Sequence, residues 1–325
     1  MKKRILSGMR PTGKLHLGNY VGALENWVKL QGDYENFHLV ADWHLLTTSL
    51  DTSQIKANTV DMVIDWLCAG INPEKSPIFV QSEVKEHAEL FLLFSMLVTI
   101  PRLERNPTVK EQAKDLGLEN NMAYGHLGYP VLQAADILIY KAHLVPVGED
   151  QLPHVELTRE IARKFNKTYG DVFIVPSGRI TEFSRLPGLD SKKMSKSLGN
   201  TILLSDEPEK IANKVKRAIT DPEKIRLGDP GHPEICNVFV YHQKFNTDQV
   251  EEIETDCKSG ALGCVACKKN LAEKLANYLE PFREKRRHYE QNIDDVKQII
   301  EKGNSIAQKV AGETMHEVYK VMNLG

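Results

Sequence analysis

The sequence predicts an α/β protein in which a parallel sheet with helices on both faces precedes a second, all-helical domain. Two observations support this prediction. Short apolar runs alternate with longer segments of helical spacing through residues 1–205, a pattern typical of β–α–β units. From residue 206 to 325 nearly every segment has helical spacing instead, so we place a domain boundary near residue 205.

Individual elements follow from the apolar pattern. The expected strands are residues 4–8, 37–44, 77–81, 136–140 and 172–176, with one more at 238–242 in the second half. The main expected helices are residues 53–70, 87–100, 152–166, 206–219, 271–303 and 305–322. The helix at 53–70 should be capped by Asp51, Thr52 or Ser53 and end at Gly70. The helix at 87–100 is apolar around most of its circumference, so we expect it to be buried in the core or between subunits.

The composition is that of an ordinary globular protein. The 325 residues include 26% charged and 41% hydrophobic side chains and carry a net charge of −2. The N-terminus has only a very short apolar run, unlike a signal peptide, and the longest apolar run, Leu90–Ile100, is too short to span a bilayer. We expect a cytoplasmic protein that binds neither membrane nor DNA, and cysteines that form no structural disulfides.

A glycine-rich turn follows the first expected strand. The stretch "GMRPTGKLHLGNY", Gly8–Tyr20, leads from that strand into a helix. Backbone N–H groups at such a turn suit phosphate, and glycine lets a ligand approach the backbone closely. His16 and Asn19 are neutral hydrogen-bond donors at this place. The turn matches neither common dinucleotide nor Walker patterns, and its glycines could also serve turn geometry alone.

A second polar motif, "SKKMSKSLGN", occupies residues 191–200. Two lysines and two hydroxyls in a loop suit transient stabilisation of a departing polyphosphate. The motif residues concerned are Lys193, Ser195, Lys196 and Ser197. Taken alone, such lysines are also typical of a solvated surface loop.

Together, "HLGN" and "KMSKS" resemble the HIGH and KMSKS motifs of class I aminoacyl-tRNA synthetases. Asn19 replaces the final histidine, and "GNYVGAL" is similar to the form found in tryptophanyl-tRNA synthetases of bacterial type. The resemblance extends over the first two-thirds of the chain through "ADWHLLT", "FVQSEVKEHAEL", "YPVLQAADILIY", "VPVGEDQ" and "LPGLDSKKMSKS". It implies a Rossmann-like catalytic domain at 1–205 and a helical anticodon-binding domain at 206–325.

The resemblance also implies a two-step reaction. The carboxylate of L-tryptophan attacks the α-phosphate of ATP, and the magnesium salt of pyrophosphate leaves. The aminoacyl group then passes to a ribose hydroxyl at the 3′ end of tRNA(Trp), and AMP is released. The family needs no protein nucleophile, so positioning and charge stabilisation supply the rate. Its members form homodimers.

The tryptophan pocket is expected in "YPVLQAADILIY". Indole has one polar group, an N–H that can only donate, and a buried carboxylate is its best acceptor. Asp136 matches the family's indole-reading aspartate. Tyr129 and Gln151 match positions that hold the substrate's amino group, while His44 is expected in the pocket wall. Gln133 stands where relatives often have an apolar residue.

The resemblance places ATP against both motifs and the turn that holds "GEDQ". Asp150 is expected to bind the ribose hydroxyls and Leu186 to pack on the adenine. The catalytic set is His16, Asn19, Lys193, Ser195 and Lys196. The full ATP set adds Arg10, Pro11, Thr12, Gly18, Gly148, Glu149, Met194 and Ser197. Lys110 or Lys114, in an expected mobile loop, could reach the phosphates.

Four cysteines stand close together in the second half. Cys236, Cys257, Cys264 and Cys267 have the spacing C-x20-C-x6-C-x2-C, which favours a metal site in a cytosolic protein. Two C-x2-C pairs would favour zinc, but only one is present. Some relatives have a similar pattern and carry an iron–sulfur cluster, so we favour [4Fe–4S], with Zn²⁺ and simple buried thiols as alternatives. Cys68 is expected in the core.

Lys268 and Lys269, beside the cysteines, are the expected tRNA contacts. Three alternatives to the whole interpretation stay open from sequence. A tyrosyl-tRNA synthetase would need a pocket for a phenol hydroxyl. A catalytically inactive tRNA-binding paralogue would not need His16, Lys193 and Lys196. A small-molecule nucleotidyltransferase shares an H-x-G-H turn but not the long helical half.

Overall fold

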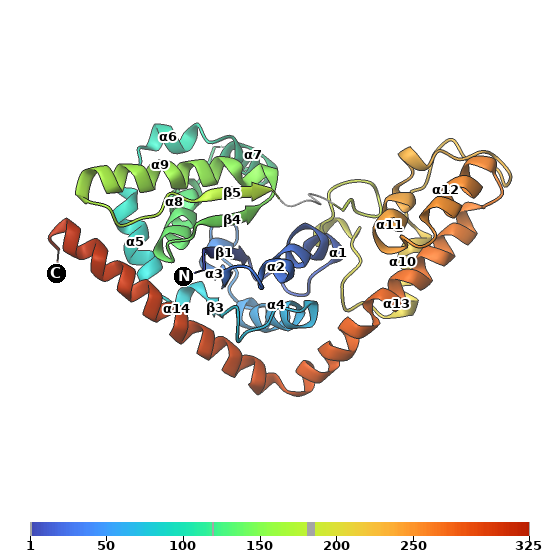
Figure 1. Ribbon diagram of the computed structural model, residues 1–325. Coiled ribbons are helices and arrows are strands. Elements are labelled where there is room, and N and C mark those ends of the chain that lie inside the picture. The colour runs from blue at the N-terminus through green and yellow to red at the C-terminus, as the bar shows by residue number, and fades with distance from the viewer. Residues whose placement is uncertain (1, 119, 181–185, 325) are drawn as a thin grey trace. The chain divides into compact units, whose positions relative to one another are not determined.

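The computed structural model describes residues 2–118, 120–180 and 186–324 (Figure 1). The chain forms two compact units. The first comprises Met1–Gly13, Glu25–Glu182 and Asn292–Gly325, and the second comprises Lys14–Leu24 and Phe183–Gln291. These units do not coincide with the expected segments 1–205 and 206–325. The glycine-rich turn crosses into the second unit, and the last helix returns to the first.

The first unit is built on a five-stranded parallel sheet of order β3-β2-β1-β4-β5 (Figure 1). The strands are β1 (Arg4–Met9), β2 (Glu35–Val40), β3 (Ile78–Val80), β4 (Leu144–Val147) and β5 (Ser177–Ile180). This confirms the predicted parallel, Rossmann-like sheet. The strand order reverses between β1 and β4, and in such sheets ligands bind beyond the carboxyl ends of the strands at that point.

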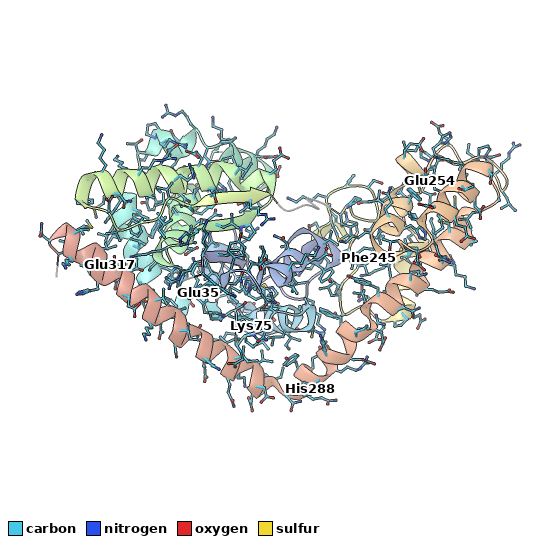
Figure 2. All side chains as sticks on the ribbon, in the orientation of Figure 1. Glu35, Lys75, Phe245, Glu254, His288 and Glu317 are labelled. Carbon is cyan, nitrogen blue, oxygen red and sulfur yellow. The ribbon has the colours of Figure 1, made fainter. Side chains whose placement is uncertain are left out.

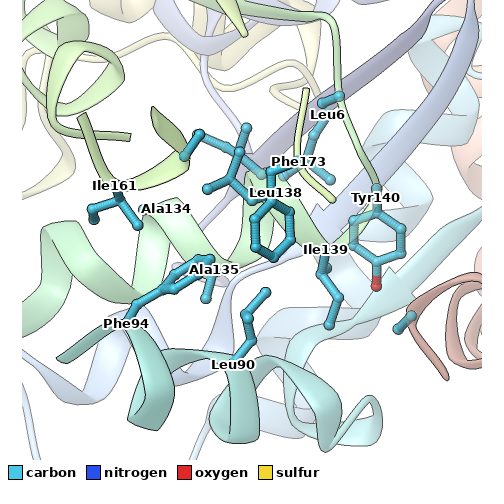
Figure 3. Packing of buried hydrophobic residues seen from close by; sticks show 14 of the residues in the cluster. Leu6, Leu90, Phe94, Ala134, Ala135, Leu138, Ile139, Tyr140, Ile161 and Phe173 are labelled. Atoms are coloured by element: carbon cyan, nitrogen blue, oxygen red, sulfur yellow. The ribbon is translucent and has the colours of Figure 1, made fainter. Parts of the chain in front are cut away.

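Helices cover both faces of this sheet. Leu6 and Phe37 contribute to the main core, which α8 (Tyr124–Ile139) and α9 (Leu152–Tyr169) cover together with α5 (Glu86–Ser95) (Figure 3). On the other face His38 stacks on Trp27 of α2 (Glu25–Leu30), with ring centroids 5.1 Å apart. Trp66 of α4 (Ile55–Ala69) meets the same imidazole edge-on. Alternating side chains of each strand therefore bury against opposite helical layers.

Three expected strands were wrong. Residues 136–140 lie at the end of α8, and residues 238–242 lie inside α11 (Asn237–Phe245). Residues 172–176 precede β5, and β4 was not predicted. The reason is physical: α8 is buried on nearly every side, so its apolar run lacks the polar face that separates a helix from a buried strand.

Helix boundaries were predicted with mixed success, since the expected helices 271–303 and 305–322 are instead Cys264–Gln291 and Ile293–Met322, with the break at residue 292. The predicted end of α4 is confirmed, because Gly70 takes a left-handed conformation with φ of 112°. Its predicted cap is wrong, since the N-cap is Gln54 and makes no side-chain cap. The α5 segment was expected to be buried in the core or between subunits; in the single chain Leu90 and Phe94 are buried, whereas Leu92 is 57% exposed.

The C-terminal helix α14 (Ile293–Met322) closes the edge of the sheet. Its Asn304 Oδ1 accepts a hydrogen bond of 2.9 Å from the backbone N–H of Val80 in β3. Gly303 lies directly over Ile78, where a Cβ atom would stand 1.8 Å from the carbonyl oxygen. Near the other end, Glu317, labelled in Figure 2, pairs with Lys141 at 2.7 Å. The edge strand is thus covered by the chain's own last helix.

The remaining helices of the first unit are short. They are α3 (Asp42–Leu46), α6 (Ile100–Glu104) and α7 (Pro107–Asp115). The second unit contains α1 (Leu17–Asn19), a π-helical turn Tyr20–Leu24, α10 (Pro208–Lys216), α11, α12 (Val250–Ser259) and α13 (Cys264–Gln291). Within it, α10 packs along α13. Among the helices of the described residues, none is long and apolar enough to cross a membrane.

Candidate active site

The side chain of Asp136 lies in the interior of the first unit at the centre of a ring of hydrogen-bond donors. It projects from α8 and is only 2% exposed. His44 Nε2 is 2.8 Å from its Oδ2, and His87 Nδ1 is 2.6 Å from its Oδ1. Gln81 Nε2 donates to both oxygens, at 2.8 and 2.9 Å. His44, which was expected in the pocket wall, thus contacts Asp136 directly.

The surroundings of Asp136 keep it ionised although it is buried. Burial alone would raise the pKa of the carboxyl, but the hydrogen bonds from His44 and His87 outweigh it and lower the pKa to about 2. At neutral pH the group is therefore a carboxylate, which can only accept hydrogen bonds.

Sequence reasoning missed two of the three donors. Gln81 follows β3 in the short 3-10 turn Gln81–Glu83, and His87 lies in the first turn of α5. Both side chains are fully buried. Their polarity inside apolar segments was the available signal, since buried polar groups are retained only when they have partners.

Tyr129 takes part in a second buried chain of hydrogen bonds. Its hydroxyl is 2.9 Å from His154 Nε2, and His154 Nδ1 is 3.1 Å from Asn106 Nδ2. Asn106 Oδ1 caps α7 by accepting from the Thr108 N–H, so its amide NH₂ must donate to His154. Burial lowers the pKa of His154 to about 4. The neutral imidazole therefore donates its other N–H to the Tyr129 oxygen.

The other two expected tryptophan residues are both half-buried. Gln133 is half-buried on α8. Gln151 is half-buried, and its amide donates to Asp150 at 3.0 Å.

In the second unit, His16 and Asn19 hold each other in place. The Asn19 backbone N–H donates to His16 Nδ1 at 3.2 Å, and the His16 N–H donates to Asn19 Oδ1 at 3.1 Å. Burial, with the nearby Lys196 charge, lowers the pKa of His16 to about 4. The neutral ring therefore carries its proton on Nε2, and the amide NH₂ is what Asn19 can offer to a ligand. Both residues present N–H donors, as phosphate binding requires.

The two motifs meet within this unit. The Gly18 backbone N–H is 3.3 Å from the sulfur of Met194, and a Cβ at Gly18 would stand 3.2 Å from that atom. The buried Asn200 fastens the lysine motif by accepting from the Ser195 N–H and donating to the Lys193 carbonyl. Lys193 and Lys196 are exposed. Sequence reasoning missed Asn200, whose role depends on the folded loop.

The remaining expected ATP residues divide between the two units. In the first, Arg10 and Thr12 are exposed while Pro11 is buried, and Gly148 leads into the 3-10 turn Glu149–Gln151 with Glu149 and Asp150 exposed. A Cβ at Gly148 would crowd the Asp150 carboxylate at 2.7 Å. In the second, Leu186 is buried and Ser195 and Ser197 share a hydrogen bond of 2.9 Å.

Known proteins are similar to this chain in sequence and in structure. The family model described as tRNA synthetases class I (W and Y) matches residues 1–280. The chain belongs to this class I synthetase family. A tryptophan–tRNA ligase from Thermotoga maritima is 52% identical, with 99% of each chain covered. One from Aquifex aeolicus is 44% identical over 99% of this chain and 100% of its own.

A solved structure supports the same class I family. The tryptophanyl-tRNA synthetase from Campylobacter jejuni, crystallised with ADP and tryptophan, superposes with a TM-score of 0.89. The two chains are 34% identical, and the match covers 99% of this chain and 100% of the Campylobacter jejuni chain. The class I synthetase fold predicted from sequence is therefore confirmed.

The four cysteines of this class I synthetase lie within electrostatic reach of one another. Burial raises the pKa of the Cys267 thiol, and the charges of Cys236, Cys257 and Cys264 raise it further. His242 Nε2 is 3.3 Å from the Cys267 sulfur, a contact that sequence reasoning missed. Across the described residues, no group of three or more His, Cys, Asp or Glu side chains is arranged to hold a metal ion. The expected metal site is thus not shown. Cys68 is buried in the first unit, as predicted.

The lysines expected to meet nucleotide or RNA lie on helices of the synthetase. Lys268 and Lys269 belong to α13, where Lys268 is half-buried and donates to the Lys216 carbonyl while Lys269 is exposed. Lys110 and Lys114 are exposed on α7. The mobile loop expected around these two residues is instead a helix capped by Asn106.

Proposed function

We propose that this chain is a tryptophan–tRNA ligase. It activates L-tryptophan with ATP to tryptophanyl-adenylate and transfers the aminoacyl group to tRNA(Trp), releasing AMP and pyrophosphate. The observation that carries the proposal is the ionised Asp136 carboxylate, 2% exposed and surrounded by donors. The full-length tryptophan–tRNA ligase relatives support it independently.

A buried carboxylate suits indole better than phenol. The indole N–H can only donate, and Asp136 can only accept, so the pair is complete. A phenol hydroxyl donates as well, but its oxygen also needs a donor of its own. A ligand that lacks an N–H or O–H donor would form no hydrogen bond with the Asp136 carboxylate, which costs about 2 kcal/mol or more. This favours tryptophan over tyrosine, the other amino acid of the family.

Activation would need charge stabilisation more than acid–base chemistry. The tryptophan carboxylate oxygen forms a bond to the α-phosphorus as the bond to the β-phosphate oxygen breaks, and pyrophosphate leaves with that electron pair. We propose that His16 and Asn19 donate to the phosphates and that Lys193 and Lys196 neutralise the leaving group, with Mg²⁺ arriving bound to ATP. Arg10, Gly148 and Asp150 remain predicted ATP contacts.

One assay tests the proposed function. ATP–pyrophosphate exchange should depend on tryptophan, with tyrosine and no amino acid giving background rates. Aminoacylation should charge tRNA(Trp) alone. Exchange with tyrosine, or nucleotidyl transfer without an amino acid, would replace the proposal with one of its rivals.

We also propose that Cys236, Cys257, Cys264 and Cys267 bind a metal centre, a [4Fe–4S] cluster before zinc. The four cysteines support this proposal, because Cys236, Cys257 and Cys264 are near enough to raise the pKa of the Cys267 thiol. Four thiolates suit either centre. Zinc would require sulfur atoms about 3.8 Å apart in a tetrahedron, whereas a cluster spans a wider set. Protein purified without oxygen should be brown and hold about four irons per chain. A colourless protein with one zinc would reverse the assignment.

We propose, finally, a homodimer with α5 near the interface. Leu92, Met96 and Ile100 are 57%, 72% and 57% exposed, an unusual run of large apolar side chains. Sedimentation should give a dimer of the 36.8 kDa chain, and Met96→Glu should shift it to monomer. A monomeric parent protein at micromolar concentration would contradict this.

A further inference from the structure

His87 has a part in the pocket that the proposed function does not yet use. Its ring is fully buried, and both of its nitrogens are engaged. Nδ1 lies 2.6 Å from Asp136 Oδ1, and Nε2 lies 2.8 Å from the Tyr140 hydroxyl. A histidine so placed links the carboxylate to the core of the first unit.

The directions of these hydrogen bonds follow from the carboxylate. An ionised Asp136 only accepts, so Nδ1 must carry the proton. Nε2 faces the Tyr140 hydroxyl at 2.8 Å. The orientation of the His87 ring, with its Nδ1–H toward Asp136, is therefore fixed by its two neighbours.

Tyr140 is packed against two strands of the sheet. It is fully buried at the end of α8 (Figure 3). Its ring stacks on Phe37 of β2 at 4.8 Å and is tilted against Phe79 of β3 at 5.1 Å. The chain of hydrogen bonds from Tyr140 through His87 to Asp136 thus starts at a side chain packed on the sheet.

The two oxygens of Asp136 are not equivalent. Gln81 donates to both oxygens, but Oδ1 also receives the fully buried His87, whereas Oδ2 also receives His44, whose side chain is 12% exposed. His44 is thus the most accessible of these three donors. An incoming indole N–H can take its place on Oδ2 without disturbing Oδ1.

We propose that His87 is a positioning residue for tryptophan selection. Through its Nδ1–H it fixes Oδ1 of Asp136 and keeps the carboxylate ionised, and so presents Oδ2 to the indole N–H, with His44 as the exchangeable donor. This inference rests on the proposed function. It adds a selectivity determinant outside the direct substrate contacts.

The first test reads the tautomer in the unaltered protein. Protein labelled with ¹⁵N-histidine, with His87 assigned by comparison with His87→Asn, should show a proton on His87 Nδ1. A proton on Nε2 alone would overturn the proposal. This measurement does not depend on whether a variant folds.

The second test compares tryptophan with its benzothiophene analogue, in which sulfur replaces the indole N–H. In pyrophosphate exchange, His87→Leu should reduce the preference for tryptophan in kcat/KM at least tenfold, mainly through KM. His87→Asn keeps a donor at the place of Nδ1 and should stay within threefold of the parent protein. His38→Leu removes another buried histidine, on the opposite face of the sheet, and should leave the preference unchanged.

The outcomes separate this inference from the proposed function. Equal losses for both substrates in His87→Leu would mean a merely structural role and would overturn the inference. If His87→Leu does not fold, the tautomer and the His87→Asn ratio decide. A parent protein that activates no tryptophan would defeat the proposed function itself.

Discussion

At the scale of single residues, the chemistry of the pocket depends on a charge that burial alone would remove. Asp136 stays ionised because His44 and His87 donate to it, and its lowered pKa expresses the balance between burial and those hydrogen bonds. In the second unit, burial and the Lys196 charge lower the pKa of His16, and its contact with the Asn19 N–H places the remaining proton on Nε2. The protonation of both residues is thus set by their surroundings.

Replacing Asp136 by asparagine should impair tryptophan use. The amide keeps the shape of the carboxylate but has no charge. Its NH₂ group is a donor and would face His44, Gln81 and His87, which are donors too. We expect KM for tryptophan to rise roughly 100-fold, equivalent to about 3 kcal/mol. Pyrophosphate-exchange kinetics measure this, and an unchanged KM would contradict the assigned role.

The same carboxylate predicts how stability depends on pH. Its pKa is lowered from 3.8 to about 2 in the folded protein, so its ionised form adds about 2 kcal/mol at neutral pH. That contribution is complete above pH 4 to 5 and is lost as the pH falls through the folded value. The difference in unfolding free energy between the parent protein and Asp136→Asn should therefore shrink below pH 4. A difference that grows on acidification would contradict this.

Sequence reasoning named residues whose chemistry follows from their type or from the family resemblance, and missed those whose role depends on the fold. Asp136 was predicted because it matches the family's indole-reading aspartate and because indole needs an acceptor, whereas its contact with His44 was not predicted. Gln81, His87 and Asn200 were missed because nothing local shows that they meet a carboxylate or a loop carbonyl. Their partners lie 55, 49 and 7 residues away.

At the scale of elements, periodicity located the helices but confused buried helices with strands. The end of α8 and residues 238–242 of α11 were expected as strands, because an apolar run of five residues fits either structure. Exposed helices such as α10, with a clear polar face, were predicted nearly in full. β4 was missed because Pro146 interrupts its short run, and proline counts against a strand.

Helix α14 offers a matched pair of glycines. Gly303 has no room for a Cβ because the Ile78 carbonyl would stand at 1.8 Å, whereas Gly312 has space, with its nearest neighbour at 3.9 Å. Gly303→Ala should destabilise the protein by about 2 kcal/mol or more through overpacking. Gly312→Ala should stabilise it by about 0.5–1 kcal/mol through helix propensity. Denaturant unfolding measures both, and similar shifts for the two would contradict the packing of α14 on β3.

The first turns of α13 carry the predicted tRNA contacts. Exchanging Lys268 and Lys269 for glutamate should weaken tRNA charging at least tenfold through KM for tRNA, because positive charges that pair with phosphates become repulsive. Tryptophan-dependent pyrophosphate exchange should be unaffected. Lys56 and Lys75, exposed on the first unit, provide a control with the same charge change. Loss of both activities in the α13 variant would indicate a folding role instead.

At the scale of the whole molecule, the chain crosses between its compact units more often than the sequence suggested. Residues 14–24 join the second unit and residues 292–325 rejoin the first. The apolar pattern of the sequence changes once, at the start of the helical half. It does not show where the chain passes from one unit to the other, since α13 and α14 look alike in sequence although they belong to different units.

A crystal structure of this chain with bound tryptophan tests the central claim most directly. The account predicts that the indole nitrogen lies about 2.9 Å from Asp136 Oδ2, a normal hydrogen-bond distance, while His87 keeps its contact with Oδ1. The account would be contradicted if the indole nitrogen faced another acceptor, or none, while His44, Gln81 and His87 all still donated to Asp136.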